Sequence, residues 1–307
     1  MAEASRLAAR KAEDITHYVP CHLMISQHPD VFSVGPVSFL SQRSFRRKIA
    51  PEVAATRTKF RRSSRYMPRV LRYYRSFGWI AEVTVKGCDR ATSEEVAVEA
   101  VTAALNCLQL LFGAAHTYKM LIGGPDLSKD WQGSFSVSNS KGLSYSVGYK
   151  GAGSVAFEDD WHRLLESADG AHLLRLCGAA TRSITDRVER PLSRRFLDAA
   201  TWFGEAVRDK SPAAKVVRYV TALERMVMTE ERNDISATIS HRVAAICCAH
   251  PHDAFDNLLS EMKEVYSLRS KLVHGSLSPY SETVFTGVRL SADLAREALF
   301  SNFRSFR

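Results

Sequence analysis

DNLLSEMKEVYSLRSKLVHG, residues 256–275, is the stretch that decides how the second half of the chain folds. At helical spacing its apolar residues form one continuous stripe, made of Leu258, Met262, Val265 and Leu272. Arg269 stands on the same stripe, between the last two of them. A guanidinium keeps its charge and is costly to bury alone, so this position predicts an anionic partner for Arg269.

The same stretch carries the signals that end a helix. Gly275 follows His274 and is a residue typical of helix C-caps, and Pro279 lies beyond it. The helix therefore brings a fixed charge, Arg269, and a titratable imidazole, His274, towards one end. Five helical steps rotate by about 140°, so these two side chains do not converge within one straight helix. We expect them to meet across a cleft between two copies of the helix, or where the helix loosens near Gly275.

Outward from this stretch, the second half of the chain is nearly all helical in pattern. Prolines separate the expected helices, which are 158–167, 170–188, 193–209, 212–229, 234–249, 254–274 and one around 291–304. Short connections between amphipathic helices are typical of an antiparallel bundle. The sequence GAGSVAFEDD at 151–160 marks the change from a mixed α and β pattern to a helical pattern. We therefore predict a helical domain over 156–307.

The first half has a mixed pattern. WIAEVTVK (79–86) alternates apolar and polar residues, which predicts a half-buried strand, and a helix is expected from Ser93 to Phe112. Residues 131–149 predict a hairpin with its turn at 139–142, whereas 31–40 fit either a strand or a buried turn. A short helix followed by irregular chain is expected over 1–30. The overall expectation is an α+β protein, with a mixed α/β domain over 1–155 before the bundle.

The net charge of +9 is unevenly placed. Residues 1–86 hold 16 Lys and Arg against 6 Asp and Glu, and RTKFRRSSRYMPRVLRYYR (57–75) holds eight basic residues and no acid. Interleaved aromatic residues make this segment a candidate surface for a polyanion such as RNA. The RNA contacts that we predict are Arg61, Arg62, Arg65, Arg69 and, beside the helix end, Lys271. The alternative is a solvated, partly helical arm whose Phe60, Leu71 and Tyr74 pack inward.

Other features restrict the class of protein. The six cysteines form no CxxC pair, no apolar run suggests a membrane span, and the N-terminus lacks the apolar core of a signal peptide. These features favour a cytoplasmic protein with reduced thiols and no membrane contact. The histidines and cysteines form no complete ligand set with useful spacing, so we expect no metal and no cofactor.

Three segments together resemble a known family. ALERMV (222–227), SHRVAAI (240–246) and VYSLRSKLVHGS (265–276) are similar to the Apea-like branch of the HEPN superfamily, over roughly residues 190–290. WIAEVTV and the helix after it more loosely resemble the segment that precedes that domain. The R-x4-H element of the family matches at Arg269 and His274. Ser270 follows the arginine, where the family more often has Asn, Asp or His.

The resemblance implies a function. HEPN proteins are helical bundles that pair so that two R-x4–6-H motifs form one cleft, and many are metal-independent endoribonucleases. By this resemblance Arg269 would hold the phosphate, and His274 would be the general base or acid for attack by the 2′-OH. Glu224, on a neighbouring helix, would orient one of the two. The resemblance also implies a homodimer through the helical domain, and a toxin or anti-phage abortive-infection role with a cognate inhibitor or a phage-derived trigger.

Three readings of the motif stay open on the sequence. The first is the ribonuclease, and the second is a non-catalytic HEPN module that binds RNA or a nucleotide through Arg269. In the third the bundle is purely structural, Arg269 pairs with a carboxylate such as Glu224, and His274 caps helix carbonyls.

Overall fold

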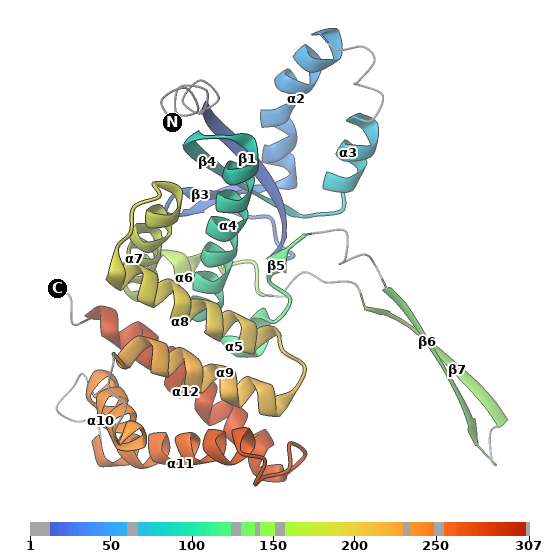
Figure 1. The fold of residues 1–307 in the computed structure, drawn as a ribbon. Helices are drawn as coiled ribbons and strands as arrows, with labels where there is room; N and C mark the ends of the chain where they lie inside the picture. The colour runs from blue at the N-terminus through green and yellow to red at the C-terminus, as the bar shows by residue number, and fades with distance from the viewer. Residues whose placement is uncertain are drawn as a thin grey trace, which may run out of the picture.

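The computed structural model describes residues 13–59, 67–123, 130–138, 142–150, 157–229, 234–248 and 255–304. It is an α+β protein in which an N-terminal antiparallel sheet precedes a helical half (Figure 1). This confirms the expected fold class at that level. The expected N-terminal helix lies partly in residues 1–12, outside the described residues.

The sheet has five strands in the order β2-β3-β4-β1-β5. They are β1 (Glu13–His22), β2 (Val31–Val34), β3 (Val37–Ser41), β4 (Trp79–Cys88) and β5 (Leu121–Ile122). The predicted strand at 79–86 is confirmed as β4, and 31–40 forms the β2–β3 hairpin. The expectation of irregular chain up to residue 30 is wrong for 13–22, because β1 pairs with β4 along almost its whole length and Pro20 lies opposite Ile80.

Alternation along β4 places side chains on both faces of the sheet. Ala81, Val83 and Val85 belong to the main core, whereas Ile80 belongs to a smaller cluster with Leu40 and Phe45. The smaller cluster lies under α2 (Gln42–Lys59) and α3 (Met67–Tyr74). The main core lies under α4 (Arg90–Phe112). The sheet is thus covered on both faces.

The central helix α4 begins earlier than expected. Asp89 is its N-cap and accepts hydrogen bonds from the backbone amides of Ala91 and Thr92, whereas Ser93 lies inside the first turn. The helix ends at Gly113, as predicted. By length and composition α4 is apolar enough to cross a membrane, contrary to the expectation from the sequence, but most of that stretch is buried inside the protein. Packing between the sheet and the helical half accounts for its composition.

The helical half follows the predicted pattern with shifted ends. After the short helices α5 (Ala114–Thr117) and α6 (Arg163–Glu166), its helices are α7 (Ala168–Thr185), α8 (Pro191–Arg208), α9 (Pro212–Val227), α10 (Ile235–Cys247), α11 (Phe255–Val273) and α12 (Glu282–Arg304). The last helix begins nine residues before the expected start. In this bundle α9 packs against α8, α11 and α12.

The core continues across the predicted domain boundary at residue 155, because α7 and α8 pack directly on α4. Two partly buried arginines add hydrogen bonds between the helical half and α4. Arg208 of α8 donates to the side-chain oxygens of Asn106 and Gln109 on α4, at 3.0 and 2.9 Å. Arg296 of α12 donates to the carbonyls of Leu110 and Leu111 at the end of α4. The strands β6 (Asp130–Ser138) and β7 (Gly142–Lys150) form the predicted hairpin, which projects away from the body (Figure 1).

Candidate functional site around Arg269

The C-terminal end of α11 has the predicted glycine cap. Gly275 has φ +71°, its amide donates to the carbonyl of Leu272, and the amide of Ser276 donates to the carbonyl of Lys271 at 2.9 Å. These two bonds are those of a Schellman motif, in which a left-handed residue ends the helix and satisfies its last carbonyls. The amide of His274 still bonds to the carbonyl of Ser270, so the helical path is regular as far as His274.

Arg269 faces the interior of the bundle. Met262 and Val265 on the same stripe are buried, and the Arg269 side chain is only 25 % exposed. Its Nη2 lies 3.4 Å from Oε2 of Glu224 on α9, a side chain that is 22 % exposed. The predicted carboxylate partner is therefore present, and it is the residue that the sequence singled out.

Tyr266 completes this small cluster. The Arg269 guanidinium lies 5.8 Å from the centre of the Tyr266 ring. Burial, together with the nearby Glu224 carboxylate, raises the pKa of Tyr266. Tyr266 is not among the residues that the sequence predicted for the site. Its one-turn spacing from Arg269 was the available signal, because residues three apart on a helix are neighbours.

One donor of Arg269 is left without a partner. Its Nε is buried and makes no hydrogen bond within the described part of the chain. The bond from Nη2 to Glu224 is also long for a charge-assisted bond, which is usually below 3 Å. A buried guanidinium donor without an acceptor is unfavourable, so the site has an unfilled capacity for an anion or a water molecule.

His274 lies elsewhere on the helix end. The residue is exposed, and within the described part of the chain its ring makes no hydrogen bond. The alternative in which this ring caps helix carbonyls is therefore not what the structure shows, since backbone amides do the capping. Of the other predicted residues, Ser270 is half-buried and Lys271 is exposed. The structure thus brings Arg269, Glu224 and Tyr266 together and leaves His274 facing outward.

A groove of about 830 Å³ lies beside this helix end. Its walls come from α8, α9, the end of α11 and the chain that follows it, and they include Trp202, Val217, Leu272 and Gly275. Neither Arg269 nor His274 is among its lining residues. The groove therefore runs next to the candidate residues without enclosing them in one protomer.

Three large apolar residues near His274 are exposed. Val273 is 51 % exposed, Tyr280 in the following turn is 86 % exposed, and Phe285 in the first turn of α12 is 56 % exposed. Single exposed apolar residues are ordinary, but three within thirteen positions around one helix junction mark a candidate contact surface.

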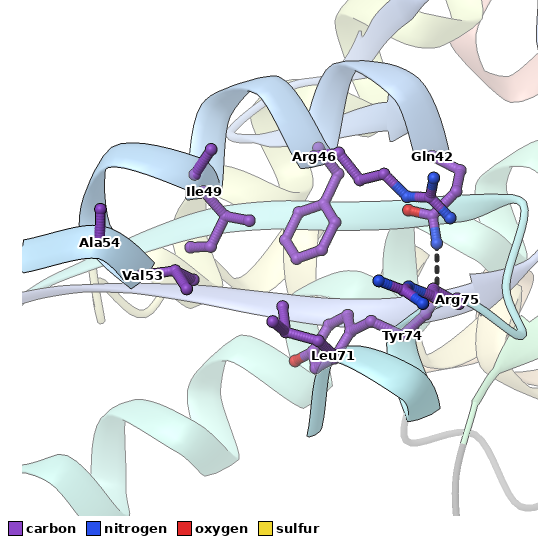
Figure 2. A pocket seen from close by; sticks show the side chains of 10 residues that line it. Gln42, Arg46, Ile49, Val53, Ala54, Leu71, Tyr74 and Arg75 are labelled. Carbon is purple, nitrogen blue, oxygen red and sulfur yellow. Dashed lines mark hydrogen bonds between the residues drawn. The ribbon is translucent and has the colours of Figure 1, made fainter. Parts of the chain in front are cut away.

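The basic segment is described only in part. Arg61, Arg62 and Arg65 lie outside the described residues; Arg69 lies in α3, and no position is described for its side chain. Figure 2 shows the slot of about 320 Å³ between α2 and α3, with Arg46 and Arg75 at the end marked by Gln42. Tyr74 packs inward, stacked on the Phe45 ring at 5.1 Å, and its hydroxyl donates to the carbonyl of Tyr18.

The inward packing of Tyr74 belongs to the alternative of a partly helical arm. Arg72 and Arg75 in the same segment are exposed, so the basic segment is still a candidate surface for RNA contact.

Among the described residues no group of three or more His, Cys, Asp or Glu side chains is placed to hold a metal ion. Comparison with protein-family models, with curated proteins and with solved structures finds no match to this chain. A functional assignment therefore depends on the chemistry of the residues around Arg269.

Proposed function

We propose that the chain is a metal-independent endoribonuclease of the HEPN type. The observation that carries the proposal is the Arg269 guanidinium, whose Nη2 lies 3.4 Å from the Glu224 carboxylate and whose buried Nε donor has no hydrogen-bond partner within the described part of the chain. A phosphodiester oxygen is an acceptor of the right charge for that donor. The R-x4-H spacing to His274 supplies an imidazole on the same helix end.

The chemistry needs few groups. The 2′-OH of a ribose attacks the adjacent phosphorus, so that the O2′–P bond forms and the P–O5′ bond breaks. His274 takes the proton from the 2′-OH or gives one to the leaving 5′ oxygen. Arg269 binds the non-bridging oxygens and stabilises the charge that develops on them. The products are a 2′,3′-cyclic phosphate and a 5′-hydroxyl, and DNA is not cut because it lacks the 2′-OH.

The composite site takes residues from two copies. Within one protomer Arg269 faces α9, whereas His274 is exposed at the helix end. The exposed residues Val273, Tyr280 and Phe285 supply an apolar surface around His274 on which a second copy can pack. The proposal requires a two-fold arrangement there that brings His274 of one copy to Arg269 of the other.

Glu224 has a positioning role in this proposal. Its carboxylate contacts Nη2 of Arg269 at 3.4 Å and would thereby restrict the direction in which the remaining donors of Arg269 point. RNA cleavage by such a site would make the chain a toxin or an abortive-infection effector, as the family resemblance implies.

The test is incubation of the purified full-length protein with RNA in EDTA, followed by analysis of the fragment ends. We expect fragments that end in 2′,3′-cyclic phosphate. Arg269→Ala and His274→Ala should each lower the cleavage rate by a factor of roughly 10² or more, because each removes a transition-state interaction of that size. Lys263→Ala, an exposed position earlier on α11, is the matched control and should cut at the parental rate.

Two results would contradict the proposal. One is cleavage at the parental rate by the Arg269→Ala/His274→Ala double variant, which would assign the activity to a contaminant or to another site. The other is cleavage at a position where the ribose has been replaced by 2′-deoxyribose. In cells, expression of the parental chain should arrest growth and expression of the double variant should not.

A second candidate function has its own supporting observation. Arg269 faces α9 and His274 is exposed at the helix end, so the two do not converge within one protomer, which suits a module that binds RNA or a nucleotide without cutting it. Such a module would give RNA retention on a filter without fragments in the same EDTA assay. Arg269→Ala would then weaken retention, and His274→Ala would leave it unchanged.

A further inference from the structure

Helix α2 presents an apolar stripe towards α3. Phe45, Ile49 and Val53 recur every four residues, so they lie on one face of α2. Leu71 and Tyr74 of α3 line the same slot. Within the described residues the two helices do not pack closely along their length, and the space between them is the slot of about 320 Å³ that Figure 2 shows. This volume is at the lower end of the range of small-molecule pockets.

One end of the slot is bridged by contacts between the two helices. The Phe45 ring stacks on the Tyr74 ring, and Nε2 of Gln42 donates to the carbonyl of Tyr74 at 2.7 Å. Because the amide nitrogen of Gln42 makes this bond, its oxygen is the atom without a partner. Oε1 of Gln42 is buried and has no hydrogen-bond partner within the described part of the chain. Buried acceptors are normally paired, so this end of the slot has an unfilled place for a hydrogen-bond donor.

Two guanidinium groups lie at the same end. Arg46 of α2 and Arg75, which follows α3, both line the slot, and Figure 2 shows them beside Gln42. Within the described part of the chain neither arginine side chain has an ion-pair or hydrogen-bond partner, and no acidic residue is among the described residues that line the slot. The next residue of α2 differs, since Arg47 pairs with Asp30 at 3.1 Å. Two unpaired like charges at one end of an apolar slot favour an anion there.

The rest of the slot fits an aliphatic group better than a nucleobase. Beyond the bridged end its lining includes Ile49, Val53 and Leu71, none of which offers an aromatic face. The two aromatic lining residues, Phe45 and Tyr74, stack on each other. Nucleobases bind to proteins largely by stacking on aromatic side chains. An aliphatic chain needs no such partner, because its burial is favoured in proportion to its apolar area.

We propose that the slot between α2 and α3 binds a small amphipathic anion. Its head, a carboxylate or a phosphate monoester, accepts hydrogen bonds from Arg46 and Arg75, and its aliphatic tail lies along Ile49, Val53 and Leu71. A slot of about 320 Å³ has room for one short tail and not for the two long tails of a bilayer phospholipid, so the ligand is a free molecule. The site is separate from Arg269 and independent of the proposed ribonuclease activity.

The test is isothermal titration calorimetry of the full-length protein with octanoate and with octyl phosphate. We expect a Kd on the order of 100 µM for both. Octanol, which has the same tail and no charge, should bind at least about tenfold more weakly. α-Hydroxyoctanoate should bind more tightly than octanoate, because its hydroxyl supplies the donor that Oε1 of Gln42 lacks.

Charge-removing variants locate the head. Arg46→Gln and Arg75→Gln should each weaken octanoate binding by a factor of about ten, because each removes one charge-assisted hydrogen bond. Arg47→Gln is the matched control, since it removes the same charge from the next residue of α2 but does not alter the lining of the slot. It should bind octanoate with the parental Kd. All three arginines are exposed, so the variants should melt at about the parental temperature.

Four results would overturn the proposal. The first is no binding of octanoate or octyl phosphate at about 1 mM, even where RNA or anionic vesicles bind through Arg46 and Arg75. The second is equal weakening by Arg46→Gln and Arg47→Gln, which would make the attraction an effect of net charge alone. The third is equal affinity for octanoate and octanol, which would exclude a role for the arginines. The fourth is equal affinity for octanoate and α-hydroxyoctanoate, which would place the head away from Gln42.

Discussion

At the scale of single residues, burial lowers the pKa of two side chains that the sequence presents as ordinary, Arg208 and His22. Arg208 donates to two neutral side-chain oxygens, and burial is the largest cause that lowers its pKa. His22 on β1 packs its ring 5.0 Å from the ring of Phe77, and burial lowers the pKa of its imidazole below the usual 6.5. Protonation of His22 therefore opposes folding, whereas protonation in the unfolded chain does not.

This has a consequence for stability against pH. Between the two pKa values the unfolded chain binds more protons at His22 than the folded chain, so stability rises with pH there. The contribution is complete above about pH 6.5–7 and is lost as the pH falls through the lower, folded-state pKa. We expect the melting temperature of His22→Gln to fall less steeply from pH 7 to pH 5 than that of the parental chain. Parallel curves by scanning fluorimetry would contradict the assignment.

At the scale of elements, Gly35 in the β2–β3 turn and Gly178 on α7 allow the hairpin to contact that helix directly. Gly35 has φ +59° at the first turn position, and since Pro36 cannot adopt a positive φ, the turn is of type II′. A Cβ on Gly35 would meet the backbone of Gly178 on α7, closer than van der Waals contact allows. Gly87 has the same φ of +59°, but a Cβ there would meet nothing within 4 Å.

Gly35 and Gly87 form a matched pair of positions for substitution. Gly87→Ala should lower the free energy of unfolding by about 1 kcal/mol, the cost of a left-handed alanine. Gly35→Ala adds overpacking against α7 and should cost about 2–4 kcal/mol in total. Urea unfolding of both variants measures the difference. Equal losses would show that the close approach of hairpin and helix contributes nothing.

At the scale of the whole molecule, the sheet and the helices share one core. Leu173 and Cys177 of α7 and Ala199 and Phe203 of α8 belong to the same buried cluster as the inner face of β4 and the length of α4. The helical half therefore has an apolar face that only α4 covers.

Removal of the first half should expose that face. We expect a fragment of residues 157–307 to unfold without a cooperative transition, or at a melting temperature at least about 10 °C lower, while the full chain unfolds in one step. Thermal unfolding followed by circular dichroism tests this. A fragment that melts cooperatively at the temperature of the full chain would instead establish an independent helical domain.

The elements that the sequence predicted are those whose signal is local. Apolar spacing located the helices from α7 to α11, alternation located β4, and Gly275 located the end of α11. The start of α12 was missed because the exposed Phe285 interrupts the apolar pattern of its first turn, although Val284 beside it is fully buried and Val288 packs on the core one turn later. The strand β1 was missed because Pro20 argues against a strand, and only the ladder formed with β4 shows otherwise.

For the candidate site the division is similar. The apolar stripe by itself determined that Arg269 faces inward and requires an anion, since burial of an unpaired guanidinium is unfavourable wherever it occurs. Only the tertiary structure decided that this anion is Glu224, 45 positions away on α9, that Nε of Arg269 keeps no partner within the described chain, and that His274 stays exposed. The physical reason is range: helix spacing and caps act over a few residues, whereas pairing of charges depends on how distant helices pack together.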